Sequence, residues 1–261
     1  MFDSISEVRV KKRLRELTDK EEILGFLLQG SRVTGFGKPD SDYDIIIYCS
    51  NKYFRTLDIK NRFESIDDEI DGKRKQVGDF AYFCDEIFEQ QKNSPMDIDH
   101  VPYLESEILL DKTGKLGEWV KSLGKIDEAM FEDRLKAQMV QLAIAFGYAT
   151  INRSREKKLD EMINLHRFLT IAVTVWFTLQ KTWVPQLKWW SNHVKKGGMD
   201  DRTFEMYQSC IQNLNYENAT TLYSRLKELI QEKGIELNLQ DEFVNTVMPE
   251  GRPAYIKHSY F

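Results

Sequence analysis

Two short apolar runs, separated by a glycine-rich loop, constrain the fold of this chain more than any other feature of its sequence. The runs are ILGFLLQ (23–29) and YDIIIYC (43–49), and the second is rich in the β-branched residues that favour strands. The thirteen residues between them, GSRVTGFGKPDSD, contain three glycines and one proline, which is typical of turns. The sequence therefore predicts two strands joined by a loop.

The rest of the first half alternates strand-like and helix-like segments. Strands are expected at 75–83 and 106–110, and helices at 4–18, 57–70, 85–91 and 115–123. Short strands separated by helical segments predict a mixed α/β sheet. The thirteen-residue segment at 30–42 is expected to be turn and loop.

From about residue 126 the pattern becomes mainly helical, as far as about residue 233. Apolar residues recur every three or four positions from Phe131 to Phe146, and helices are also expected at 159–180, 201–213 and 217–233. The predicted fold class is α+β, with a first domain at 1–125, a helical bundle at 126–240 and an extended C-terminal arm at 241–261. His166 shares an apolar helix face with Met162 and Leu169, which predicts a core histidine.

Composition excludes several classes of protein. The 261 residues are 41% hydrophobic and 30% charged, with a net charge of -5, so there is material for a core but no basic footprint for long nucleic acid. No apolar stretch reaches the ~20 residues of a membrane span, and the charged N-terminus lacks the apolar core of a signal peptide. Three scattered cysteines give no zinc or disulfide spacing (Cys49, Cys84 and Cys210). A cytoplasmic protein, without a membrane partner, is expected.

The loop and the second run carry residues suited to phosphate and metal chemistry. At Gly30-Ser31, a missing side chain and a small hydroxyl let backbone N–H groups approach a phosphate closely. Asp42 and Asp44 are two residues apart at the start of a strand, so their carboxylates face the same side, and Tyr43 faces the other. Two converging carboxylates next to a phosphate-binding turn predict a Mg²⁺ site.

This arrangement resembles the DNA polymerase-β-type nucleotidyltransferase superfamily, whose pattern is a strand, Gly-Ser, about ten residues, and Asp-apolar-Asp. The resemblance implies a third carboxylate on a later strand. Asp79 in QVGDFAYF is the preferred candidate, because its strand is longer, and Asp99 in MDIDHV is the alternative. A helical domain after the nucleotidyltransferase domain is the arrangement of the antibiotic nucleotidyltransferases, which adenylylate aminoglycosides or lincosamides.

Further residues are candidates for nucleotide binding. Arg32 follows Gly30-Ser31 and is expected to pair with a phosphate oxygen or to be an exposed turn arginine, and Ser41 is expected in the nucleotide site or in turn capping with Asp40. The resemblance implies that a lysine of the helical domain binds the triphosphate, and Lys188 is the matching residue. Its tryptophan neighbours could stack on a base or pack in the bundle (Trp183, Trp189 and Trp190).

The resemblance implies transfer of a nucleoside monophosphate, AMP from ATP, to a hydroxyl of a small acceptor such as an antibiotic. Mg²⁺ and ATP, or another NTP, are the expected cofactor and co-substrate, and Asp79 is expected to bind metal or to take the acceptor's proton. The acidic run at 64–71 is compatible with a cationic acceptor. Two alternatives remain: a protein- or RNA-modifying nucleotidyltransferase of the antitoxin type, and a non-catalytic nucleotide-binding regulatory module.

Overall fold

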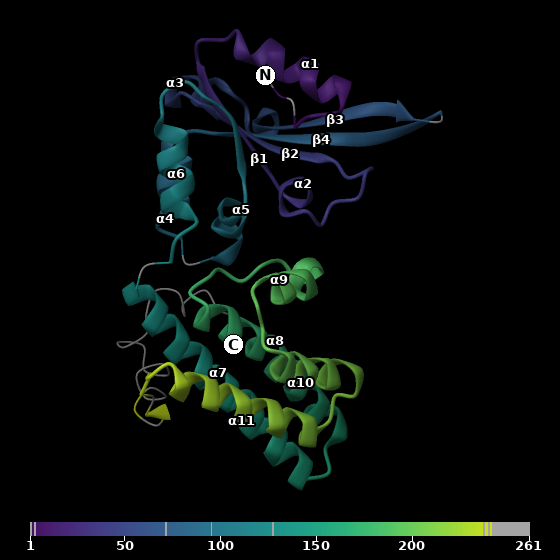
Figure 1. The fold of residues 1–261 in the computed structure, drawn as a ribbon, viewed down its shortest axis with the longest axis vertical. Coiled ribbons are helices and arrows are strands. Elements are labelled where there is room, and N and C mark those ends of the chain that lie inside the picture. The colour runs from purple at the N-terminus through teal and green to yellow at the C-terminus, as the bar shows by residue number, and fades with distance from the viewer. Residues whose placement is uncertain are drawn as a thin grey trace. The chain divides into compact units, whose positions relative to one another are not determined.

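The structure is a computed structural model, and it describes residues 2, 4–70, 72–94, 96–126, 128–236, 238, 239 and 241. The chain divides into two compact units, Met1–Lys125 and Ile126–Phe261 (Figure 1). The extended arm predicted at 241–261 lies outside the described residues, except for Asp241. Each unit is described by itself.

The first unit is built on a five-stranded mixed sheet with the order β3-β4-β2-β1-β5. The pairs β1–β2, β1–β5 and β3–β4 are antiparallel, and β2–β4 is parallel, so the predicted mixed sheet is confirmed. The two apolar runs form neighbouring strands with the predicted bounds. The strands are β1 (Ile23–Gln29), β2 (Tyr43–Cys49), β3 (Phe63–Ile70), β4 (Lys73–Phe83) and β5 (Glu107–Asp111).

Helices cover both faces of this sheet (Figure 1). Alternate residues of β2 serve the two faces: Ile45 and Ile47 pack with α1, whereas Ile46 and Tyr48 pack in a second apolar cluster with residues of α4, α5 and α6. The helices of this unit are α1 (Val8–Thr18), α2 (Ser31–Thr34), α3 (Asn51–Thr56), α4 (Asp85–Lys92), α5 (Val101–Leu104) and α6 (Lys115–Leu123), with 3-10 turns η1 (Ile59–Arg62) and η2 (Asp97–Asp99).

The helix predicted at 57–70 is wrong, because most of this segment is strand β3. The apolar residues from Ile59 to Ile70 are spaced three and four apart, as in a helix, but the segment pairs antiparallel with β4 from Phe63 onward. Its acidic residues form ion pairs with basic residues of neighbouring segments, as in the Arg9–Asp68 pair of 2.7 Å. Sheet pairing with a distant strand outweighs a weak local helical pattern. The loop also contains a helix that was not predicted, the short α2.

The second unit is helical, as the predicted α+β class requires. Its long helices α7 and α8 pack together, and α8 is buried along its C-terminal half. His166 is exposed, so the prediction of a core histidine is wrong; the buried face of α8 instead passes through Leu165 and Phe168. The elements are α7 (Glu128–Ser154), α8 (Lys158–Leu179), η3 (Leu187–Trp189), α9 (Trp190–Lys196), α10 (Asp201–Gln212) and α11 (Tyr216–Glu232).

Helix α8 is long and apolar enough to cross a membrane by length and composition, contrary to the expectation from the sequence that no apolar stretch reaches that length. Of its most apolar eighteen-residue window, 56% is buried inside the unit. A core helix of a water-soluble bundle has the same composition, because it is surrounded by other helices. Among the described residues, it is the one helix of this kind.

Candidate active site

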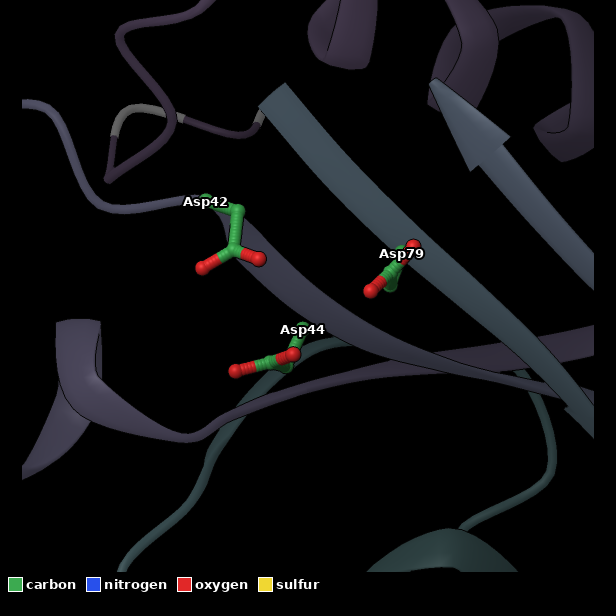
Figure 2. Close-up of side chains that lie close together, drawn as sticks. All are labelled: Asp42, Asp44 and Asp79. Carbon is green, nitrogen blue, oxygen red and sulfur yellow. The ribbon is translucent and has the colours of Figure 1, made fainter. Parts of the chain in front are cut away.

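Three aspartates converge on one face of the first unit's sheet. One carboxylate oxygen from each of Asp42, Asp44 and Asp79 lies within 4.8 Å of the others, and all three residues are half-buried. Figure 2 shows the three side chains directed into a common space, Asp42 from the residue before β2, Asp44 from β2 and Asp79 from the neighbouring strand β4. Within the described part of the chain, this is the one group of three or more potential metal-binding side chains.

Strand pairing explains why the three carboxylates meet. Strands β2 and β4 run parallel in a register that places Asp44 directly beside Asp79. Neighbouring residues in register project to the same face of a sheet, and Asp42, two residues before Asp44, projects to that face as well. Tyr43 faces the opposite side, where it is buried and its hydroxyl oxygen accepts a hydrogen bond of 3.0 Å from the Ser6 N–H.

Gly30 is the residue that lets Asp44 occupy its position. Strand β1 ends at Gln29, and Gly30 has φ 78° and ψ -154°, a backbone conformation essentially restricted to glycine. A Cβ atom at Gly30 would lie 2.0 Å from Oδ2 of Asp44. The chain then enters α2 at Ser31, whose carbonyl oxygen accepts a 2.8 Å hydrogen bond from the Gly37 N–H. The Gly-Ser turn and the Asp44 carboxylate are therefore in contact.

Arg32 and Ser41 stabilise the loop in this structure. The Arg32 guanidinium donates hydrogen bonds of 3.0 Å to the carbonyl oxygens of Pro39 and Ser41, and it lies 4.4 Å from the centre of the Tyr43 ring. The Ser41 hydroxyl accepts a hydrogen bond of 2.9 Å from the Lys38 N–H, which is ordinary turn capping. These contacts correspond to the turn roles that the sequence left open for both residues.

Two further polar contacts flank the aspartates. Asp40 forms an ion pair of 3.2 Å with Lys75 of β4, and this hydrogen bond and charge hold the pKa of Asp40 below its ordinary value. Asp79 accepts a hydrogen bond of 2.9 Å at Oδ1 from the Ser65 hydroxyl of β3. Ser65 was not among the predicted site residues, because the sequence pattern predicts a helix there, and only the long-range pairing of β3 with β4 brings it to Asp79.

Asp99, the alternative third carboxylate, lies elsewhere in the first unit. It belongs to the 3-10 turn η2 and accepts a hydrogen bond from the Ser94 hydroxyl. It is not a member of the aspartate group. Of the two candidates named from the sequence, the structure therefore brings Asp79 to Asp42 and Asp44.

The remaining predicted residues belong to the second unit. Lys188 is exposed in η3, and its ammonium lies 5.5 Å from the centre of the Trp189 ring. Trp183 is 1% exposed and lies 5.1 Å from the Arg134 guanidinium, so it packs inside the unit and is not available to stack on a base. The Trp190 indole N–H donates a hydrogen bond of 2.5 Å to the carbonyl oxygen of Pro185.

The aspartate group fits a small divalent cation. Mg²⁺ binds oxygen ligands at about 2.1 Å, so ligand oxygens on opposite sides of the ion lie about 4 Å apart, and adjacent ones lie closer. Carboxylate oxygens within 4.8 Å of one another reach such an ion with small side-chain rotations. Three carboxylates with a cation between them form a site that suits the phosphates of a nucleotide.

Comparisons with known proteins found matching family models for two segments of the chain. Residues 11–94 match the family model "Polymerase beta, Nucleotidyltransferase", and residues 101–190 match a domain of unknown function, DUF4037. A nucleotidyltransferase-like protein from Exiguobacterium sibiricum has a similar structure, with a TM-score of 0.49 and 12% identity over 93% of this chain and 79% of that chain. None of the curated proteins compared matches the chain.

The first unit is a nucleotidyltransferase domain. Its sheet, its Gly-Ser turn and its matched residues 11–94 place this unit in the DNA polymerase-β-type nucleotidyltransferase superfamily.

Proposed function

We propose that the protein is a Mg²⁺-dependent nucleotidyltransferase that transfers a nucleoside monophosphate, AMP from ATP, to a hydroxyl of a small acceptor. The observation that carries this proposal is the convergence of Asp42, Asp44 and Asp79 next to the Gly30-Ser31 turn. A family domain alone does not establish activity, because a fold can host several functions. Metal-assisted nucleotidyl transfer requires carboxylates that converge on one point, and the register of the strands holds three of them together here.

In the proposed reaction, the acceptor oxygen attacks the α-phosphorus of the nucleotide, the bond to the β-phosphate oxygen breaks, and pyrophosphate leaves. Asp42 and Asp44 hold Mg²⁺, which supplies neutralising charge to the nucleotide phosphates. The backbone at Gly30 and Ser31 binds phosphate oxygens through its N–H groups. The acceptor's hydroxyl proton goes to Asp79 or, where Asp79 is a metal ligand, to solvent.

One experiment tests the activity directly. The full-length protein is incubated with Mg²⁺ and each of four α-³²P-labelled NTPs, in parallel with aminoglycosides, lincosamides, RNA and a cell protein extract. We expect label from ATP to appear on a small molecule, and EDTA to abolish it. Label on RNA or protein would favour the antitoxin-type alternative. Absence of transfer and of pyrophosphate release from every mixture would contradict the proposal.

Asp79→Asn separates the two roles of that residue. If Asp79 takes the proton, the variant should bind Mg·ATP like the wild type but turn over far more slowly. If Asp79 is chiefly a metal ligand, binding should weaken as well. Isothermal titration with a non-hydrolysable ATP analogue measures binding, and labelled transfer measures turnover. A variant that loses neither would remove Asp79 from the mechanism.

A further inference from the structure

Four polar side chains form a row across the sheet, and only two of them are site aspartates. Asp44 of β2 is in register with Gln29 of β1 on one side and with Asp79 of β4 on the other. Asp79 is in turn in register with Ser65 of β3. Residues directly opposite one another project to the same face of a sheet. The row therefore runs Gln29, Asp44, Asp79, Ser65.

Packing confirms that Gln29 and Asp44 project to one face. Alternate residues of a strand share a face, so Gln29 projects with Leu27, and Asp44 projects with Ile46. Leu27 and Ile46 are both fully buried in the same apolar cluster. Gln29 thus lies beyond the end of that cluster, in register with Asp44.

The two ends of the row differ in hydrogen bonding. The Ser65 hydroxyl donates a hydrogen bond to Oδ1 of Asp79, so that end is satisfied within the protein. At the other end, the Gln29 Oε1 atom is buried and has no hydrogen-bond partner among the described protein atoms. A buried polar atom without a partner destabilises a fold by ~1–3 kcal/mol, and in a native protein it calls for a water, an ion or a functional role. A leucine at this position would avoid that cost.

We propose that Gln29 is a further oxygen of the cation site: its Oε1 accepts a hydrogen bond from a water molecule in the hydration shell of the ion held by Asp42, Asp44 and Asp79. This inference rests on the proposed function. Mg²⁺ retains several of its waters in proteins, and such waters need acceptors around the carboxylates. A neutral amide oxygen provides an acceptor without adding a fourth negative charge.

A measurement of Mn²⁺ binding to the full-length protein by electron paramagnetic resonance, without nucleotide, tests this role. Gln29→Leu removes the oxygen at nearly constant volume. We expect its Kd for Mn²⁺ to rise roughly tenfold, because loss of an outer-shell partner typically weakens a metal site by ~10–100-fold. The melting temperature without metal should stay equal or rise, since an unpartnered buried oxygen is removed.

Gln138→Leu is the matched control. Gln138 of α7, in the second unit, also has a buried Oε1 without a hydrogen-bond partner in the described structure. The same chemical change there should leave the Kd for Mn²⁺ at its wild-type value. Gln29→Glu provides a second variant in case Gln29→Leu fails to fold: a carboxylate facing the ion should tighten Mn²⁺ binding severalfold.

The outcomes separate this inference from the proposed function. Wild-type Mn²⁺ affinity in both Gln29 variants would overturn the role of Gln29 and leave nucleotidyl transfer intact. Mn²⁺ binding that depends on Gln29, in a protein that transfers no nucleotide, would support the role of Gln29 and contradict the proposed activity. A wild-type protein that does not bind Mn²⁺ would overturn the role of Gln29.

Discussion

At the scale of single residues, Asp44 is the position of the site that constrains its neighbours most. It is in register with Asp79, and it leaves no room for a side chain at Gly30. The motif from Gly30 to Asp44 could be identified from the sequence, since strand alternation alone places Asp42 and Asp44 on one face. Gln29 and Ser65 could not be identified, because their relation to the aspartates depends on pairing between distant strands.

Asp44→Asn should lower Mg²⁺-dependent transfer by about a hundredfold or more and leave the melting temperature near that of the wild type. Charge stabilisation by a bound metal ion contributes several kcal/mol, and each 1.36 kcal/mol corresponds to tenfold in rate. Steady-state transfer rates and thermal melts measure the two effects.

Asp40→Asn is the control for that experiment. Asp40 lies in the loop that leads into β2, but it is exposed and pairs with Lys75, and exposed ion pairs contribute ~0–1 kcal/mol. We expect transfer within a few-fold of the wild type. Equal rates for Asp44→Asn and Asp40→Asn would contradict the assignment of Asp44 as a metal ligand.

Gly30→Ala should disrupt the site more than Gly35→Ala does. Both glycines have positive φ, 78° and 77°, so both substitutions carry a backbone cost, on the order of 1–3 kcal/mol. An added Cβ meets Asp44 Oδ2 at Gly30, whereas it meets nothing within 4 Å at Gly35. Mn²⁺ affinity should therefore fall only in Gly30→Ala, while both variants melt at lower temperature. Unchanged Mn²⁺ binding in Gly30→Ala would disprove the steric argument.

At the scale of secondary structure elements, the sequence predicted best where a segment is buried on both sides. Strands β1 and β2 have the predicted bounds, because continuous apolar runs leave little choice. Strand β3 was predicted as a helix, because an edge strand rich in charge lacks a clear alternation. The short helix α2 was missed, since four residues give no periodic signal.

Asp85 joins three elements of the first unit. It is the first residue of α4, and its Oδ1 accepts hydrogen bonds of 2.7 Å from the Tyr48 hydroxyl of β2 and 3.0 Å from the Trp119 indole N–H of α6. Burial of the carboxylate opposes its ionisation, but these bonds and the nearby Lys115 outweigh burial and lower the pKa of Asp85. The ionised carboxylate therefore stabilises the docking of both helices.

Asp85→Asn should lower the stability of the first unit at pH 7 by about 1 kcal/mol, after allowance for partial exposure. A lowered pKa in the folded state contributes stability above the unfolded value of about 3.9 and loses it as the pH falls through the folded value. The difference from the wild type should therefore narrow below about pH 4. Urea unfolding at pH 7 and pH 3 measures this. Glu86→Gln, which removes a surface ion pair with Arg55, is the control. If the loss of stability in Asp85→Asn, relative to the wild type, is equal at pH 7 and pH 3, the argument is contradicted.

At the scale of the whole molecule, the predicted site residues are divided between the two units. The first unit contains the three aspartates and has its own apolar clusters on both faces of the sheet. The second unit contains Lys188, the residue that the resemblance to antibiotic nucleotidyltransferases assigns to the triphosphate. Sequence pattern predicted a helical second half, but periodicity alone does not reveal an acceptor, because it reports which residues are buried and not which surface binds a ligand.

The last prediction therefore concerns the division of binding between the units. A fragment of residues 1–125 retains every residue of the aspartate group and both apolar clusters, so it should fold and bind Mn²⁺ with an affinity close to that of the full-length protein. It should transfer no nucleotide, since an open sheet surface exposes the activated phosphate to water and provides no acceptor site. If Lys188 has the role that the resemblance implies, Lys188→Ala in the full-length protein should weaken binding of an ATP analogue roughly tenfold, the expected effect of losing one charge-assisted hydrogen bond, and leave Mn²⁺ affinity unchanged. Isothermal titration measures both affinities, and Lys181→Ala, a lysine of the same unit that pairs with Glu128, is the control. Wild-type ATP affinity in Lys188→Ala, or full transfer by the fragment, would show that the first unit binds the triphosphate alone.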